Sequence, residues 1–396
     1  MEEWKEYKIG DICRIKHGFA FKGIHFVDEP QKYVCLTPGN FALKGGFKND
    51  KPKYYNGPIP EDYVLQKDDL VVTMTDLSKN GDTLGYSALI PYDEHYIFLH
   101  NQRIGLIEDI STDIDKHFLY WVMRTYDYQR YIVGHCSGST VKHTSPSGIG
   151  SYIFRCPEMK MQKEIASILD NLDDKIAVNK QINDNLEQQA QALFKSWFVD
   201  FEPFKNGEFV ESELGMIPKG WRVGKLGELC QFKRGKGLLS KNAIPGDVPV
   251  VAGGLEPACY HNISNTKAPV ITVSGSGANA GFMRMYHQEV WASDCSFIDI
   301  TCENWLFVYC FLAINSHLLK HAQTGAVQPH VKPADIHDFD LAIPPKEYIQ
   351  RFQDKISSFI TKKGLLEQES RRLAELRDAL LPKLMSGELK VNEIEK

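Results

Sequence analysis

Three short segments carry the side chains best suited to contact a nucleic acid, and each segment occurs twice in the chain. Each combines glycine, which allows close backbone approach, with basic, amide or hydroxyl groups. Lys and Arg can reach phosphates or guanine edges, and Gln can bond adenine, with about 1–3 kcal/mol of discrimination per base. The candidate DNA-contacting residues are Lys16, His17, Lys22, Lys79, Asn80, Thr140, Lys142 and His143 in the first half of the chain, and Lys233, Arg234, Lys236, Ser274, Ser276, Asn279, Gln328, His330 and Lys332 in the second.

Each of these segments also has an interpretation without nucleic acid. The basic stretches could be solvated surface, and the glycine-rich stretch 270–281 could be a structural turn. A nucleotide-binding loop is disfavoured there, because the G-x-G-x-x-G spacing is missing and no Lys-Ser/Thr follows. His143 and His330 could brace their loops. No nucleophile or carboxylate recurs beside them, so a catalytic role is not indicated.

The segments occur twice because a whole module is duplicated. Residues 4–18 and 221–235 share Trp, Lys, Gly, Cys, Lys and Gly in register. The offset falls from 217 to 187 along the chain, so the first module has 30 extra residues before Leu119. Such a long period excludes a solenoid, whose units are about 20–50 residues, and predicts approximate two-fold symmetry. Further matched pairs are Thr73 with Thr272, Gly85 with Gly281, Asn101 with Asp294, and His143 with His330.

Each module is followed by a heptad stripe typical of a coiled-coil seam. We expect the two helices to pair antiparallel with each other, a separate protein partner being the alternative. Gly364 and Pro382 should locally weaken or bend the second helix. The seam positions are Ile165, Leu169, Leu172, Ile176, Asn179, Asn183, Leu186, Ala190, Leu193 and Trp197, and Phe352, Ile356, Phe359, Lys363, Leu366, Ser370, Leu373, Arg377, Leu380 and Leu384.

Apolar residues beside these stripes predict a protein interface, because a large exposed apolar patch usually marks one. The flanking residues expected to be exposed are Ile168, Phe194, Phe198, Leu365 and Leu376.

Composition indicates a globular protein with an uneven charge distribution. The net charge is −5, and residues 158–213 alone contribute −6, whereas residues 219–241 carry a local charge of +6. The nine cysteines include no C-x-x-C pair, so a zinc site is not expected. Cys13 and Cys230 recur among apolar neighbours and are predicted to be core thiols. The sequence has neither an apolar run of about 18 residues nor a secretory signal, and we expect a reducing cytoplasm without membrane attachment.

Taken together, these residues resemble the specificity subunits of type I restriction–modification systems. The resemblance rests on the repeated opening W-x-x-x-K-[IL]-G-[DE]-[IL]-C, the module–helix–module–helix order, and the phrases W-F-V-D-F-E-P-F and S-E-L-G-M-I-P-K-G-W. It covers nearly the whole chain. It implies two target-recognition domains, each reading one half of a split, asymmetric double-stranded DNA site. It also implies helices that dock two methyltransferase subunits, which motor–nuclease (restriction) subunits then join.

The expected fold is α+β, with two similar mixed α/β recognition domains separated by two long helices in an antiparallel coiled coil. The expected ranges are 1–157 and 220–344 for the recognition domains, 158–200 and 345–387 for the helices, 201–219 for a linker, and 388–396 for a tail.

Catalytic signatures are missing from the sequence. It has no N-P-P-[FY] or D-P-P-Y methyltransferase motif, no P-loop and no convincing nuclease set. We therefore expect recognition without catalysis and no cofactor in this chain; the resemblance implies that S-adenosylmethionine (SAM), ATP and Mg²⁺ belong to partner subunits. A stand-alone methyltransferase or nuclease, and a coiled-coil scaffold that binds protein only, remain the alternatives.

Overall fold

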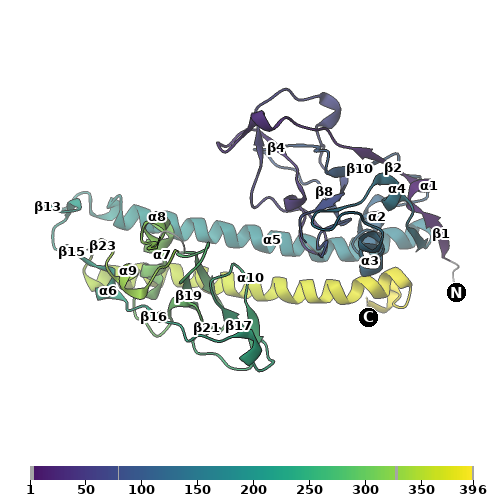
Figure 1. The fold of residues 1–396 in the computed structure, drawn as a ribbon. Helices are drawn as coiled ribbons and strands as arrows, with labels where there is room; N and C mark the ends of the chain where they lie inside the picture. Colours follow the sequence, from purple (N-terminus) through teal and green to yellow (C-terminus); the bar gives the residue numbers. More distant parts are fainter. Residues whose placement is uncertain (1–3, 79, 326–328, 395–396) are drawn as a thin grey trace. The chain divides into compact units, whose positions relative to one another are not determined.

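The computed structural model describes residues 4–78, 80–325 and 329–394 and divides into two compact units. Unit 1 comprises residues 1–176 and 372–396, and unit 2 comprises residues 177–371. Each unit therefore combines one module with segments of both long helices (Figure 1). This division differs from the predicted one, in which the helices were separate from the recognition domains.

The module of unit 1 is a mixed α/β structure built on two four-stranded sheets. The buried strand β6 (Leu70–Thr73) lies inside the first sheet, because its L-V-V-T side chains are all covered. This sheet has the order β2 (Arg14–His17), β10 (Ile104–Glu108), β6, β8 (Ser87–Leu89). The second has the order β3 (Phe26–Val27), β5 (Tyr54–Tyr55), β4 (Tyr33–Cys35), β9 (Ile97–Leu99). The module also contains α2 (Lys116–Val122), α3 (Tyr126–Gly134), α4 (Pro146–Gly150) and the pair β1 (Lys5–Lys8) with β12 (Ile153–Cys156).

The module of unit 2 repeats this plan in a shorter form. Its central sheet has the order β16 (Lys233–Arg234), β22 (Cys295–Asp299), β19 (Val270–Ser274), β20 (Met283–Tyr286). A three-stranded sheet has the order β18 (Cys259–His261), β17 (Val248–Val251), β21 (Trp291–Ala292). The module also contains α6 (Leu226–Leu229), α7 (Trp305–Ile314), α8 (Ser316–His321), α9 (Pro333–His337) and the pair β15 (Arg222–Lys225) with β23 (Asp340–Ile343). Both modules thus have the predicted mixed α/β character.

Two recurring glycines mark the same close approach in both modules. A Cβ on Gly18 would lie 2.0 Å from Asn101 O, and a Cβ on Gly235 would lie 2.2 Å from Ser293 O. Only glycine fits such a contact, so both copies keep it. The contact also corrects the predicted alignment, because Asn101 corresponds to Ser293 and not to Asp294.

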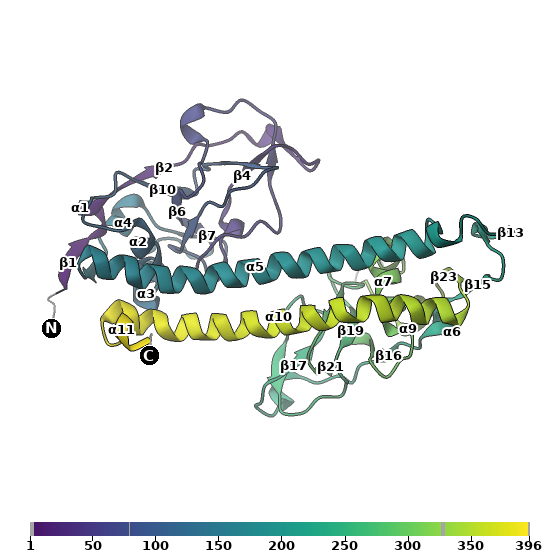
Figure 2. The same cartoon turned by 180° about the vertical axis from the view of Figure 1, so that it is seen from behind.

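The long helices are α5 (Met159–Phe198) and α10 (Lys346–Ser386). Inside unit 2 they run antiparallel, as Figure 2 shows: Asn179 bonds Ser370 Oγ at 3.3 Å, and Asn183, one turn later, bonds Lys363 O at 3.5 Å. The predicted seam lies on covered faces of the helices. Its buried members include Ile165, Leu169, Phe352, Ile356, Leu366 and Leu384, and its half-buried members include Leu172, Ile176, Leu186, Leu193, Trp197, Phe359, Leu373 and Leu380.

Two of the apolar flanks predicted to be exposed are buried. The ring of Phe194 lies 5.1 Å from that of Phe307, and the ring of Phe198 lies 4.9 Å from it. The heptad pattern describes only the seam, whereas the core of the second module covers another face of α5. Leu365 and Leu376 are exposed as predicted, at 58% and 48%.

The second helix is continuous through both of its predicted weak points, because α10 includes Gly364 and Pro382. At Gly364 the missing side chain makes room for His287, whose Nδ1 would lie 2.8 Å from an added Cβ. A glycine in mid-helix therefore has a packing reason here.

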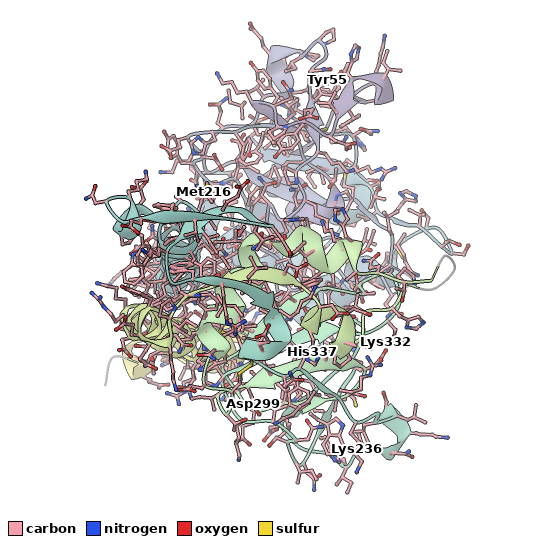
Figure 3. All side chains as sticks on the ribbon, turned by 90° about the vertical axis from the view of Figure 1, so that its left-hand side faces the viewer. Tyr55, Met216, Lys236, Asp299, Lys332 and His337 are labelled. Carbon is pink, nitrogen blue, oxygen red and sulfur yellow. A yellow bond between two sulfur atoms is a disulfide. The ribbon has the colours of Figure 1, made fainter. Side chains whose placement is uncertain are left out.

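The predicted linker contains a hairpin, and one of the two predicted thiols is part of a disulfide. Within 201–219, β13 (Phe209–Ser212) and β14 (Gly215–Pro218) form a hairpin that exposes Met216 (Figure 3). Cys13 is a free cysteine, and burial raises its pKa to about 11. The prediction of a free thiol at Cys230 is wrong, because a disulfide joins it to Cys302, with the Cα atoms 6.1 Å apart.

Candidate nucleic-acid interface

Two of the three predicted segments meet in each module. In unit 1, β7 (Thr75–Asp76) pairs with β11 (Lys142–His143), and Thr75 Oγ1 lies 3.1 Å from His143 Nδ1. In unit 2, an equivalent bridge joins Ser276 to His330. The glycine turn and the G-x-x-x-x-H loop therefore form one continuous surface in each module.

The third segment joins this surface in unit 2 through the carboxylate of Asp294, which is not among the predicted DNA-contacting residues. Arg234 on β16 forms a salt bridge with Asp294, and Ser276 Oγ donates a hydrogen bond to the same carboxylate. Asp294 therefore links the basic strand to the glycine turn. Lys236, two residues after Arg234, is exposed at an outer edge of the module in Figure 3.

The corresponding basic residues of unit 1 differ in exposure and in whether their charge already has a partner. Lys16 Nζ donates to Asp62 O at 2.7 Å and lies 3.6 Å from Glu108 Oε1, so its charge already has partners. His17 and Lys22 are exposed. Of this group, these two side chains are the more accessible candidates for phosphate contact.

The glycine turn of unit 1 is closed by a buried carboxylate. Asp76 accepts hydrogen bonds from Ser78 N at 2.6 Å and from Thr83 Oγ1 at 2.7 Å. Burial opposes ionisation of Asp76, but these bonds outweigh it and lower the pKa of the carboxyl group. An ionised Asp76 therefore braces the turn and leaves Asn80 exposed at its tip.

The turn of unit 2 is braced from outside, by the loop after β17. Gly253 O accepts hydrogen bonds from Ser274 Oγ and Asn279 Nδ2, both at 3.3 Å. Ser274 is only 3% exposed, so its predicted place among the DNA-contacting side chains is wrong: it faces the interior at the end of a buried strand. The paired glycines at 253 and 254 were the only sequence signal for this loop.

Most of the other candidates lie at the surface. Asn80, Thr140, His143, Lys233, Lys236 and Lys332 are exposed, and Lys142, Ser276, Asn279 and His330 are half-buried. Lys79 and Gln328 lie outside the described residues, so their predicted roles remain predictions.

A groove of about 740 Å³ lies beside the turn of unit 2. One wall is the turn itself with α7 and α8, and the other is formed by the unit 2 segments of α5 and α10. Glu187 forms a salt bridge with Lys363 in that second wall, where both side chains are largely buried. This wall is therefore a fixed polar surface.

The described residues include no group of three or more His, Cys, Asp or Glu side chains arranged to hold a metal ion. Among the described helices, none is both long enough and apolar enough to cross a membrane.

Comparison with known proteins identifies the same family over most of the chain. The family model described as "Type I restriction modification DNA specificity domain" matches residues 1–188 and 218–377. The type I restriction enzyme MjaIX specificity subunit of Methanocaldococcus jannaschii is 31% identical over 70% of this chain and 70% of its own length. The HindI specificity subunit of Haemophilus influenzae is 25% identical over 98% of this chain and 100% of its own. The crystal structure of a type I S subunit from M. genitalium has a TM-score of 0.56 at 19% identity, covering 97% of this chain and 96% of that one.

Proposed function

Because the chain belongs to the family of type I restriction–modification DNA specificity proteins, we propose that it reads a bipartite double-stranded DNA site, one module per half-site. Its role in that family is DNA recognition within a larger complex, not catalysis. The observation that carries the proposal is the duplicated surface made of glycine turn and histidine loop. Since the turn tips differ between modules, the two half-sites should differ in sequence.

The helices are proposed to dock two methyltransferase subunits, which restriction subunits then join. Exposed apolar side chains on α5 and α10 support a protein interface: Val178, Ile182, Leu365 and Leu376 are 37–58% exposed. SAM, ATP and Mg²⁺ would bind to those partners. The complex would act in the cytoplasm, where the chromosomal DNA lies.

A methylation experiment tests this function. The chain is co-expressed with its methyltransferase subunit, and the purified complex is incubated with SAM and a DNA library in which both half-sites are randomised. We expect methylation confined to one split, non-palindromic sequence. Methylation by the chain alone would instead indicate a stand-alone enzyme, and assembly without any DNA preference would indicate a scaffold.

A further inference from the structure

The glycine turn is closed by the same backbone hydrogen bonds in both modules, although the turn differs in length. We call this set of bonds and the residues that make them the frame. Gly85 N donates to Thr73 O at 2.9 Å, and Gly281 N donates to Ser274 O at 2.9 Å. Thr73 therefore corresponds to Ser274, which corrects the match to Thr272 that the sequence predicted. Leu84 N bonds Gly81 O in unit 1, as Ala280 N bonds Gly277 O in unit 2.

Positive φ angles at the same frame positions make glycine necessary there. They are 73° and 81° at Gly81 and Gly85, and 80° and 79° at Gly277 and Gly281. Between the matched strand ends and the second glycine, the first module has residues 74–84 and the second has residues 275–280. The frame is thus constant, and the tip that it carries differs in both length and composition.

In both modules a glutamine side chain donates a hydrogen bond to a backbone carbonyl of this frame and so clamps it. The glutamine occupies a different sequence position in each module. Gln129 Nε2 on α3 donates to Leu84 O at 3.2 Å and to Gly81 O at 2.8 Å. Gln323 Nε2, after α8, donates to Ala280 O at 2.8 Å. Leu84 and Ala280 are equivalent frame residues, since each precedes the second glycine.

The gapless offset of 187 residues between the modules shows that the two glutamines do not occupy corresponding positions. Gln129 corresponds to Ser316, and Gln323 corresponds to Cys136. The packing agrees with this offset, because Ile132 contacts the Cβ position of Gly85 and Leu319 contacts that of Gly281. Two different positions therefore supply the same donor to the same carbonyl, which indicates a requirement of the frame and not a residue shared by descent.

We propose that Gln129 and Gln323 are positioning residues for base recognition, each fixing the turn whose tip reads one half-site. This inference rests on the proposed function. A carbonyl held by a side-chain donor keeps the tip in one conformation, so the tip meets base edges without ordering on binding. Loss of the clamp should broaden base preference in its own half-site and leave the other half-site unchanged.

The test uses the full chain in complex with its methyltransferase subunit and the library described above. Gln323→Glu keeps the size of the side chain and removes its donor; we expect discrimination in the second half-site to fall about tenfold, within the range of one lost base contact. Gln129→Glu should have the same effect on the first half-site only. Gln188→Glu, at an exposed position of α5 in unit 2, is the matched control and should leave both half-sites unchanged.

Moving the donor separates positioning from general stability. In Gln323→Ala/Ser316→Gln the amide is supplied from the position that the first module uses, and we expect the second half-site preference to return. The unaffected half-site in each variant reports that the complex is folded. Unchanged preference in both Glu variants, or equal loss in both half-sites, would overturn the proposal. A wild-type complex without any half-site preference would instead overturn the proposed function.

Discussion

At the scale of single residues, the candidate interface depends on side chains that hold loops as much as on those that face outward. Asp76, Asp294 and Ser274 each fix a turn or join two segments. Lys233 and Lys332, by contrast, are exposed to solvent. Substitutions in the two groups should therefore differ: bracing residues affect the shape of the surface, and exposed residues affect contacts with DNA.

Two exposed lysines should separate base reading from phosphate contact. Lys332→Ala should relax the bases read by the second module only, by about 5- to 150-fold in discrimination, if Lys332 meets a base edge. Lys233→Ala should weaken all sequences alike and reduce the salt slope of binding by about one, as expected for a phosphate contact. Binding to a randomised library at several salt concentrations measures both effects. A change of preference in both half-sites after Lys332→Ala would contradict independent reading.

His287 predicts acid sensitivity of unit 2. Burial, and then the charge of Lys363, lower its pKa to about 4, although Glu187 opposes the shift. The unfolded chain then binds more protons between pH 6.5 and 4, so stability falls with acidification through that window. The loss should approach about 3 kcal/mol, since one pKa unit corresponds to about 1.36 kcal/mol.

Thermal unfolding from pH 7 to pH 4 measures this loss. His287→Gln should reduce the dependence of stability on pH. His95→Gln, at an exposed position, should leave that dependence unchanged. An identical acid dependence in His287→Gln and in the wild type would rule out His287 as the source.

At the scale of elements, the two long helices combine an apolar seam with a buried polar centre. Asn179 is 0% exposed and donates to Glu369 and Ser370, while its Oδ1 has no hydrogen-bond partner. Such a residue costs stability but favours one register over others.

Asn179→Leu should therefore stabilise the chain while weakening its specification of register. We expect a gain of about 1–3 kcal/mol from removal of the unsatisfied carbonyl group. Denaturant unfolding measures the gain, and Asn171→Leu, at an exposed position of the same helix, is the control. A loss of stability in Asn179→Leu would indicate that the bonds to Glu369 and Ser370 outweigh the unsatisfied oxygen.

At the scale of the whole molecule, the exposed apolar side chains of α5 and α10 predict that the chain does not remain a soluble, monodisperse monomer when it is alone. With the proposed methyltransferase partner it should form a monodisperse complex, because that partner would cover the surface. Light scattering of the chain with and without the partner checks this. A soluble monomer that is unaffected by the partner would count against docking through the helices. Leu365→Lys should weaken assembly, and Leu239→Lys, at an exposed loop position, should not.

Helix length should also set the spacing between half-sites. Removing one heptad from each helix shortens it by about 10 Å at 1.5 Å per residue. This equals about three base-pair steps of 3.4 Å. The methylated site should keep both half-sequences and lose spacer bases; an unchanged spacer would show that helix length does not set the distance.

The sequence by itself determined the features that depend on local pattern. The duplication, the heptad seam and the glycine positions follow from spacing along the chain, because helical periodicity and positive φ angles are local requirements. The tertiary structure alone decided which distant residues meet. It buried Phe194 and Phe198 under the second module, matched Thr73 with Ser274, and brought Gln129 and Gln323 to equivalent carbonyls. Such contacts depend on packing between segments far apart in sequence, and a loop of different length shifts any alignment drawn across it.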